Sequence, residues 1–461
     1  MMRDAASPVP KSFPLTGKRV LVLGLGDTGL SVARWVERQG GRVRVADTRK
    51  NPPRAKDFAG ELHTGAFGAP LLADVDLVCI SPGLPLRDPL VAAAVQRSIP
   101  VLGDIELFAW HVHAGGPAFV IGVTGTNGKS TVTALTGHLL RGAGVDCEVA
   151  GNIGPPALEA LARRAVPPAA WVLELSSYQL ETTWSLAADA AALLNLSEDH
   201  LDRYASLDEY AEAKARIFIG GGMQVLNRDD PRSRAAAIRG RRQASFGLDV
   251  PPGAEDWGIV QVKGAKWLAQ GANPLLELAA LPIHGLHNAA NALAACALAR
   301  AAGAPYDALV EGLRTFRGLP HRLERVATRG GVDWYDDSKG TNVGATVAAL
   351  RGLNRRTVLI LGGDGKGQDF SPLREPVREF ASHVLLIGRD APLIAKVVQG
   401  ERCDSLESAV RRAARLAKPG EAVLLSPACA SFDMFRDYPH RGEVFAAAVR
   451  GLKAAKGVAA R

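Results

Sequence analysis

The feature that most constrains this chain is a repeated alternation of short apolar runs with alanine-rich segments of helical periodicity. Each apolar run ends in Gly, Ser, Asp or Asn. We predict these runs as buried strands: Lys18–Leu23, Arg42–Ala46, Leu77–Ile80, Phe119–Val123, Trp171–Leu175, Ala191–Asn195, Thr357–Leu361, Val384–Ile387 and Ala422–Leu425. Continuous apolar strands separated by helices indicate an α/β fold of parallel sheets flanked by helices. Ligands of such folds bind beyond the carboxyl ends of the strands, so strand-end residues carry most of the functional information.

The length of the chain predicts several domains. Its 461 residues are enough for roughly two to four domains of ordinary size, and we predict three, at residues 1–109, 110–318 and 319–461. The segment Pro251–Leu281 has strand and turn signals and is predicted as a side sheet of the middle domain. Hydrophobic residues make up 47% and charged residues 22%, which excludes a disordered chain. The 5 cysteines form no CxxC pair and predict reduced thiols in a cytosolic protein.

The chain has a basic net charge, but its basic residues are spread along the sequence. Lys and Arg number 55 against 47 Asp and Glu, which gives a net charge of +8. Without a long basic run, this surplus favours anionic small substrates over a nucleic-acid partner. No stretch approaches the ~20 apolar residues of a membrane span, and the start, Met1 to Phe13, lacks the apolar core of a signal peptide. We therefore expect neither nucleic-acid binding nor membrane insertion.

A glycine-rich turn, Gly24-Leu25-Gly26-Asp27-Thr28-Gly29, follows the first predicted strand and precedes a helical pattern. It has the GxGxxG spacing, with Asp47 about 20 residues further on. Glycines let backbone N–H groups approach a diphosphate at a helix start. Taken alone, the turn predicts an NAD(H) site, with a packing turn and another nucleotide such as a UDP-sugar as alternatives. Ser81-Pro82-Gly83 is a candidate second phosphate-contacting turn.

A second loop, Thr124-Gly125-Thr126-Asn127-Gly128-Lys129-Ser130-Thr131, joins a predicted strand to an apolar helix. Successive backbone amides of such a loop bind anions, Lys129 neutralises phosphate charge and Ser130 offers a hydroxyl to Mg²⁺. Val123 stands where the general GxxxxGK[ST] pattern has its first glycine, so this is a variant phosphate loop.

Three further residues are candidates around this loop. Glu174 lies in an otherwise apolar strand, where a charge is costly unless it is paired or bound to a metal. His200 follows the end of another strand and is a candidate metal or phosphate contact. Lys214 lies on a predicted helix, Tyr210–Phe218, and the pattern alone predicts a solvated lysine.

Together these motifs resemble the Mur ligase family, whose members add amino acids to bacterial cell-wall precursors. The motifs occur in the family's order: Gly-Thr-Asn-Gly-Lys-Ser-Thr at 125–131, Glu-Leu-Ser-Ser at 174–177, Glu-Asp-His at 198–200, His-Asn-x-x-Asn at 287–291 and Leu-Pro-His-Arg at 319–322. Segments 24–29 with 47–49, 337–342, 362–366 and 426–433 resemble the members that add D-glutamate to UDP-N-acetylmuramoyl-L-alanine. The resemblance covers essentially the whole chain after the leader.

The resemblance implies a three-domain architecture. It consists of a Rossmann-like UDP-sugar domain (1–109), a central P-loop ATPase-like domain (110–318) and a Rossmann-like C-terminal domain (319–461) for the incoming amino acid. The implied reaction uses ATP, passes through an acyl phosphate and gives ADP and phosphate during peptidoglycan precursor synthesis. We expect a cytoplasmic monomer.

The resemblance also implies site residues. The UDP-sugar residues are Gly26, Asp27, Thr28, Asp47, Thr48, Arg49, Ser81, Pro82, Gly83 and Asn152. The ATP residues are Gly125, Thr126, Asn127, Gly128, Lys129, Ser130, Thr131, Asn288, Asn291, Arg322, Asp337 and Lys339. Two Mg²⁺ sites are implied, with the ligands Ser130, Glu174, His200 and a carbamylated Lys214. The glutamate residues are Thr341, Lys366, Ser431, Phe432 and Tyr438, and the catalytic residues are Lys129, His200, Lys214 and Arg322.

Three alternatives are weaker. A related ligase for diaminopimelate or lysine would carry an Asp-Asn-Pro-Arg motif, which this chain lacks. A nucleotide sensor without chemistry would not need the full set of candidate metal ligands. An NAD-dependent dehydrogenase is suggested by the first glycine-rich turn alone and leaves the phosphate loop unexplained.

Overall fold

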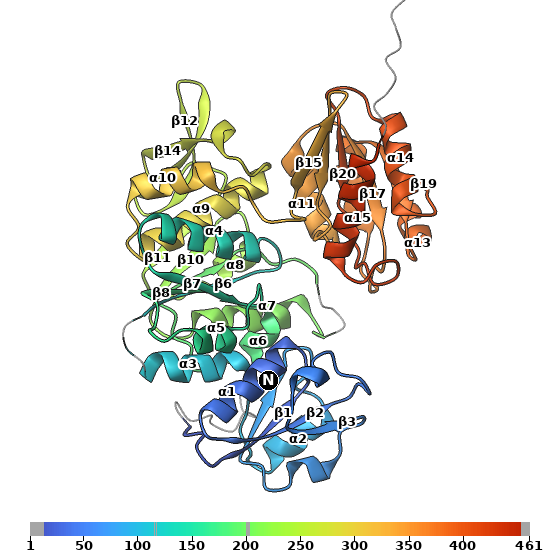
Figure 1. The fold of residues 1–461 in the computed structure, drawn as a ribbon. Coiled ribbons are helices and arrows are strands. Elements are labelled where there is room, and N and C mark those ends of the chain that lie inside the picture. Colours follow the sequence, from blue (N-terminus) through green and yellow to red (C-terminus); the bar gives the residue numbers. More distant parts are fainter. Residues whose placement is uncertain (1–12, 115, 117, 200–202, 453–461) are drawn as a thin grey trace, which may run out of the picture.

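The computed structural model describes residues 13–114, 116, 118–199 and 203–452, which form three α/β bodies (Figure 1). In that view the N-terminal body (blue) lies below the central body (green to yellow), and the C-terminal body (orange to red) lies beside the central one. The predicted α/β class is confirmed, because each body holds a sheet of largely parallel strands with helices against it. Residues 1–12 of the predicted leader lie outside the described residues.

The N-terminal body is a parallel five-stranded sheet with the order β3-β2-β1-β4-β5. Its central strand β1 is buried from Val20 to Leu23, which explains its continuous apolar sequence. The strands are β1 (Arg19–Leu23), β2 (Arg42–Asp47), β3 (Glu61–Thr64), β4 (Leu77–Ile80) and β5 (Val101–Leu102). The helices are α1 (Asp27–Arg38), α2 (Pro89–Gln96), α3 (Asp104–Ala114) and the short 3-10 helices η1 (Ala55–Asp57) and η2 (Ala69–Leu72).

The central body is a nine-stranded sheet with the order β14-β13-β12-β11-β10-β9-β6-β8-β7. Its strands are β6 (Phe119–Thr124), β7 (Cys147–Gly151), β8 (Ala170–Glu174), β9 (Ala190–Leu193), β10 (Met223–Asn227), β11 (Gln243–Phe246), β12 (Trp257–Val262), β13 (Ala265–Gln270) and β14 (Asn273–Glu277). Its helices are α4 (Lys129–Gly142), α5 (Ala157–Arg163), α6 (Ser177–Glu181), α7 (Leu207–Ala215), η3 (Arg216–Phe218), α8 (Pro231–Ala235), η4 (Leu278–Ala280), α9 (Leu286–Ala301) and α10 (Tyr306–Thr315).

The predicted side sheet over Pro251–Leu281 is an antiparallel meander of β12, β13 and β14. Its tight turn at Lys263 and Gly264 has positive φ at both residues, as a two-residue hairpin requires. The meander is not a separate sheet, because β12 pairs with β11 and so extends the edge of the central sheet.

The C-terminal body is a six-stranded sheet with the order β15-β16-β20-β17-β18-β19, in which β15 alone is antiparallel. Leu359 and Leu361 of β17 belong to one core cluster and Val358 and Ile360 to another, so this strand is covered on both faces. The strands are β15 (Glu324–Arg329), β16 (Val332–Asp336), β17 (Thr357–Gly362), β18 (Ala381–Ile387), β19 (Glu401–Arg402) and β20 (Ala422–Leu425). The helices are α11 (Val343–Leu353), η5 (Ser371–Leu373), α12 (Arg374–Phe380), α13 (Ala391–Ala395), α14 (Leu406–Leu416) and α15 (Tyr438–Arg450).

The register of the central sheet brings strand ends together. Val123 of β6 lies opposite Glu174 of β8, and Thr124 lies opposite Leu193 of β9. The phosphate loop, Glu174 and the segment after β9 therefore share one edge of the sheet, where ligands of parallel sheets bind. Among the helices that the structure describes, none is long and apolar enough to cross a membrane.

Candidate active site

The phosphate loop connects β6 to the N-terminus of α4. Gly128 has φ +87°, and a Cβ there would lie 2.4 Å from Oδ1 of Asn291, so this position requires glycine. The ammonium group of Lys129 donates to the carbonyls of Gly125 (2.9 Å) and Thr126 (2.8 Å). Burial is the main cause that lowers the pKa of Lys129. The loop thus holds a lysine directly beside the backbone that is expected to bind phosphate.

Asn195, which follows β9, fixes the tip of this loop. Its Oδ1 accepts from the backbone N–H of Asn127 (2.8 Å), and its Nδ2 donates to the carbonyl of Asn127 (2.9 Å). The carbonyl of Asn195 also accepts from the backbone N–H of Thr126 (2.8 Å). Sequence reasoning did not single out Asn195, although it stands at the end of a predicted strand, where functional residues of such folds gather.

Glu174 is a buried carboxylate at the end of β8, with 2% of its surface exposed. Its Oε1 accepts from Nδ2 of Asn152 (2.6 Å), whereas its Oε2 has no hydrogen-bond partner among the described residues. An unpartnered buried carboxylate oxygen is costly, and it suits a cation. Asn152 also lines the cleft beside the N-terminal glycine-rich turn. It therefore connects the predicted metal ligand Glu174 with the predicted UDP-sugar site.

Lys214 of α7 is 1% exposed, so the pattern-based prediction of a solvated lysine is wrong. Its ammonium nitrogen lies 4.6 Å from the ring centroid of Tyr210, one turn earlier on the same helix. Burial, followed by the nearby positive charge of Lys129, lowers the pKa of Lys214 well below its usual value. His200, which we also predicted as a metal ligand, lies outside the described residues.

Residues from beyond the central sheet also reach the phosphate loop. Nη2 of Arg322, in the C-terminal body, donates to Oγ of Ser130 (2.6 Å). Nδ2 of Asn291 on α9 donates to Oδ1 of Asn288 (3.1 Å). Asn291 also lies against Gly128, so the structure places Asn291 beside the loop and Asn288 in contact with Asn291.

Asp337 and Lys339 lie on the loop after β16. Asp337 is partly buried, and loss of hydration raises its pKa to about 7; it accepts from Oγ of Ser426 (2.7 Å) and from the backbone N–H of Leu323 (3.1 Å). The ammonium group of Lys339 lies 4.0 Å from the ring centroid of Tyr438. Burial and the neighbouring charge of Arg322 lower the pKa of Lys339 to about 8.

Four of the five residues predicted for the amino acid lie on loops after three neighbouring strands, β16, β17 and β20, and the fifth, Tyr438, begins α15. The backbone N–H of Ala428 donates to the carbonyl of Gly340 (2.9 Å), and Asp364 pairs with Ala430 as an isolated bridge. These contacts draw the three loops together. Ser431 is buried, whereas Phe432 is 71% exposed, so of the Phe432 groups the backbone suits the predicted role better than the ring.

A cleft of about 630 Å³ lies between the N-terminal and central bodies. All the predicted UDP-sugar residues line it, together with Gln179 and the neighbours of Asn152, which the sequence did not single out. Asp47 accepts from the backbone of Leu25 (2.7 Å) and from Nη2 of Arg49 (2.6 Å). Although burial opposes the effect, these contacts lower the pKa of Asp47 to about 2. Asp47 therefore orients Arg49, which is 51% exposed.

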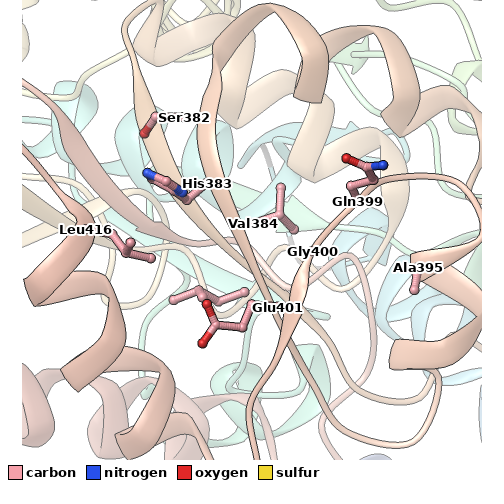
Figure 2. A pocket seen from close by; sticks show the side chains of 9 residues that line it. Ser382, His383, Val384, Ala395, Gln399, Gly400, Glu401 and Leu416 are labelled. Atoms are coloured by element: carbon pink, nitrogen blue, oxygen red, sulfur yellow. The ribbon is translucent and has the colours of Figure 1, made fainter.

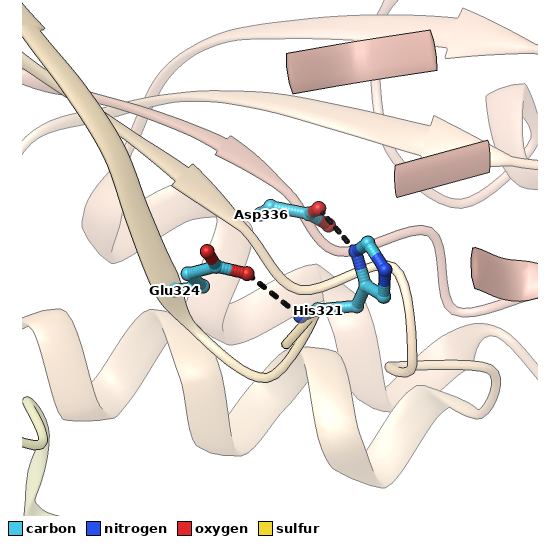
Figure 3. A group of neighbouring side chains, drawn as sticks. All are labelled: His321, Glu324 and Asp336. Atoms are coloured by element: carbon cyan, nitrogen blue, oxygen red, sulfur yellow. Dashed lines mark hydrogen bonds and ion pairs between the residues drawn. The ribbon is translucent and has the colours of Figure 1, made fainter. Parts of the chain in front are cut away.

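Two other features of the C-terminal body contain none of the residues predicted for the substrates or the metal. A hollow of about 590 Å³ lies over β18 and β19, lined by Ser382, His383, Gln399 and Glu401 among others (Figure 2). His321, Glu324 and Asp336 form a group whose possible ligand atoms lie within 4.8 Å of one another (Figure 3). In that group Nδ1 of His321 lies 2.7 Å from Oδ2 of Asp336, and its backbone N–H donates to Glu324 (3.0 Å). These hydrogen bonds fix the backbone and side chain of His321, which directly precedes Arg322.

The family is settled by matches along the chain. Three protein-family models match: the MurD-like N-terminal domain of Mur ligases over residues 18–103, the Mur ligase middle domain over 123–299 and the Mur ligase glutamate ligase domain over 321–429. The chain belongs to the Mur ligase family, and the resemblance seen in its motifs is confirmed.

Individual relatives are more specific. The chain is 55% identical to the UDP-N-acetylmuramoylalanine–D-glutamate ligase of Nitrosospira multiformis over 459 residues, which cover 96% of this chain and 97% of the relative. It is 55% identical to the protein of the same name from Thiobacillus denitrificans, over 96% of this chain and 98% of the relative.

Solved structures show the same fold at low identity. MurF from Acinetobacter baumannii has a TM-score of 0.60 at 18% identity and covers 96% of this chain and 92% of its own. The UDP-N-acetylmuramate–alanine ligase MurC from Thermotoga maritima has a TM-score of 0.58 at 18% identity, with coverages of 94% and 100%.

Proposed function

We propose that this protein is an ATP-dependent ligase that adds D-glutamate to UDP-N-acetylmuramoyl-L-alanine in cytoplasmic peptidoglycan precursor synthesis. Relatives of that name match it over nearly their whole length, and the Mur ligase family is ATP-dependent. The observation that carries the proposal is the 2.6 Å contact between Arg322 and Ser130, which joins the phosphate loop to the body that holds the predicted amino-acid loops.

The nucleotide is proposed to lie on the phosphate loop. The backbone amides from Gly125 to Thr131 would receive its phosphates, and Lys129 would exchange its two carbonyl contacts for phosphate oxygens. Asn291 lies beside the loop and contacts Asn288, and Arg322, Asp337 and Lys339 approach from the C-terminal body. Phosphoryl transfer depends mainly on positioning and charge stabilisation, which this arrangement of fixed cations supplies.

The residues fit a magnesium site. Oε2 of Glu174 is buried without a described partner, and the hydroxyl of Ser130 and the side chain of Lys214 lie on elements around the same loop. Carboxylate and hydroxyl oxygens are the ligands that Mg²⁺ prefers. When bound, Mg²⁺ would offset the repulsion between the triphosphate and the acceptor carboxylate. We propose Ser130, Glu174, His200 and Lys214 as ligands of two such ions.

Lys214 needs a chemical change for this role, because an ammonium group cannot bind a cation. Its burial favours the neutral amine, which is the form that reacts with carbon dioxide to give a carbamate. The carbamate carries a negative charge and two oxygens. We therefore propose that Lys214 is carbamylated.

The two acids are proposed to approach from opposite sides. UDP-N-acetylmuramoyl-L-alanine would lie in the cleft lined by Gly26, Asp27, Thr28, Asp47, Thr48, Arg49, Ser81, Pro82, Gly83 and Asn152. Glutamate would lie at Thr341, Lys366, Ser431, Phe432 and Tyr438. The alanine carboxylate would attack the γ-phosphorus of ATP, so that the bond to the bridging oxygen breaks, ADP leaves and an acyl phosphate forms. The glutamate amine would then attack the acyl carbon, lose a proton and displace phosphate to form the amide. Lys129 and Arg322 hold the converging charges in an in-line geometry.

A phosphate-release panel tests the function. The purified protein receives Mg·ATP and UDP-N-acetylmuramoyl-L-alanine with D-glutamate, L-glutamate, diaminopimelate or no amino acid. We expect phosphate and a heavier nucleotide-peptide with D-glutamate alone, and neither product from Lys129→Ala. A product with diaminopimelate would assign the protein to another branch of the family, and no product in any arm would refute the ligase.

We also propose the domain boundaries 1–109, 110–318 and 319–461 and a monomeric state. The three sheets use strands from within these three ranges, which supports the division. The first boundary falls inside α3, where Ala109 and Trp110 are buried, so limited proteolysis should cut near the second boundary and not the first. Light scattering after gel filtration should give a mass close to 48.6 kDa.

A further inference from the structure

Arg441, the fourth residue of α15, is a fully buried arginine with 0% of its surface exposed. Its Nε donates to Oγ of Ser338 (2.9 Å) and its Nη2 to the carbonyl of Ser338 (2.8 Å). Its Nη1 donates to the carbonyl of Cys429 (3.1 Å). One guanidinium group therefore binds two loops that follow different strands, β16 and β20.

This charge is expensive for the fold. Among the described residues the Arg441 guanidinium forms no direct ion pair, and the carboxylates of Asp433, Asp336 and Asp337 act on it only from a distance. Burial lowers its pKa to about 10, so it remains charged at neutral pH. A buried charge without a paired carboxylate is costly, and a cation in the first turn of a helix opposes the helix dipole. An apolar side chain of similar volume would serve packing alone better.

The contacts of Arg441 fall on two loops, of which the one after β16 carries proposed ATP residues as well as Thr341 of the proposed amino-acid site. Ser338 stands between Asp337 and Lys339, and Cys429 lies two residues before Ser431. Oγ of Ser338 in turn donates to the carbonyl of Tyr438 (2.8 Å). Arg441 thus sets the spacing of the loop after β16, the loop after β20 and the start of α15.

We propose that Arg441 is a positioning residue for the amino-acid site, where its planar fork fixes the two loops at the spacing that a dicarboxylic amino acid requires. Its fixed positive charge also favours an anionic ligand between those loops. The inference rests on the proposed function, since it assigns a role within the proposed glutamate site. Arginine rather than lysine suits this role, because a guanidinium presents its donors in a rigid fork.

The test compares three full-length variants with the wild type. Arg441→Met removes the charge and the fork, and Arg441→Lys keeps the charge without the fork. Phe445→Leu, one turn later on α15, is the matched control, because Phe445 is equally buried and packs beside Trp334, with a ring-centroid distance of 6.3 Å, in the core cluster on that face. KM values for D-glutamate, ATP and the UDP-linked acceptor are measured for each, with melting temperatures.

For Arg441→Met we expect the KM for D-glutamate to rise about tenfold or more, since displacing a positioned group by about 1 Å can cost 100-fold. The KM for the UDP-linked acceptor should stay within about twofold. The KM for ATP should rise less than that for D-glutamate, because Ser338 stands between two proposed ATP residues. Arg441→Lys should lie between Arg441→Met and the wild type. Phe445→Leu should lower the melting temperature without a selective KM change.

Other outcomes overturn the inference. An unchanged KM for D-glutamate in Arg441→Met, or an equal rise of all three KM values, would leave Arg441 a structural residue. If Arg441→Met does not fold, Arg441→Lys is judged by the same two criteria. If the wild type makes no amide from D-glutamate, the proposed function itself fails, which is a separate result.

Discussion

Lys214 is the residue whose proposed chemistry departs most from its ordinary behaviour. We expect Lys214→Ala to lose most of its ligase activity, by about 100-fold or more as for the loss of one group that stabilises the transition state, because a Mg²⁺ ligand is removed. With ¹³C-bicarbonate, the wild type should show a carbamate carbonyl resonance that Lys214→Ala lacks. Arg216→Ala, two residues further on, is the control and should retain that resonance. Retained Mg²⁺ affinity and rate in Lys214→Ala would return the residue to a packing role.

His321 offers a prediction on pH. Its hydrogen bond to Asp336 raises the pKa of the imidazole above its usual value. The stabilisation is therefore fully present below the unfolded pKa of about 6.5 and is lost as the pH rises through the folded pKa. His321→Asn keeps a residue that tolerates the positive φ of this position, +61°, but cannot titrate.

The measurement is the melting temperature of wild type and His321→Asn between pH 5.5 and 9. The wild type should be more stable by about 3 °C at the acidic end, as for a charge-assisted hydrogen bond, and the gap should narrow toward pH 9. A gap that is constant or widens with pH would show that Asp336 does not hold a protonated His321.

The environments of Lys214 and Arg441 could not be predicted from local sequence patterns. Periodicity on α7 predicted a solvated Lys214, because a pattern records spacing along one helix and not what packs against it. The resemblance to a family placed that lysine in the site, and its burial agrees with that placement. No local signal distinguished Arg441 from other helical arginines, since its partner Ser338 is 103 residues away and its partner Cys429 lies outside the helix, 12 residues away.

At the scale of elements, α11 is a helix that begins beside the phosphate loop. Its N-cap Asn342 accepts from the backbone N–H of Ala345 (2.8 Å). We expect Asn342→Ala to lower the free energy of unfolding by about 1 kcal/mol, because one helix-end donor loses its partner. Asn342→Ser keeps a capping oxygen and should cost only a few tenths of that. Chemical denaturation measures both, and equal losses would mean that capping is not what Asn342 contributes.

The sequence predicted about half of the strands and the side sheet, and it missed β3, β5, β7, β10, β11, β15, β16 and β19. Strands buried on both faces, such as β17 and β20, appear as continuous apolar runs, and the predicted bounds agree within a residue or so for most of them. The meander of β12 to β14 was recognised as strands but not as part of the central sheet. Its attachment depends on one pairing, Phe246 with Trp257, and pairing between distant segments leaves no periodic trace.

At the scale of the whole molecule, α9 of the central body packs against α11 of the C-terminal body, and two sets of side-chain hydrogen bonds join these bodies over the phosphate loop. One is Arg322 with Ser130. In the other, Nδ2 of Asn342 donates to Oδ1 of Asn127 (3.3 Å) and Oδ2 of Asp199 (3.2 Å). Thr341, a predicted glutamate residue, directly precedes Asn342. The loop that would bind glutamate is therefore held to the phosphate loop through Asn342. Domain closure of this kind assembles catalytic groups and excludes water.

Asn342→Ser distinguishes the capping role of Asn342 from its contacts with the central body, because serine retains the capping oxygen but lacks the amide donors. We expect a broader distribution of distances between dyes at Val166→Cys in the central body and Leu393→Cys in the C-terminal body, both exposed positions. Addition of Mg·ATP and D-glutamate should narrow the distribution in the wild-type background more than in Asn342→Ser. Identical distributions in the two backgrounds, with and without ligands, would show that the Asn342 contacts do not hold the bodies together. The packing of α9 against α11 and the Arg322 contact would then hold the two bodies.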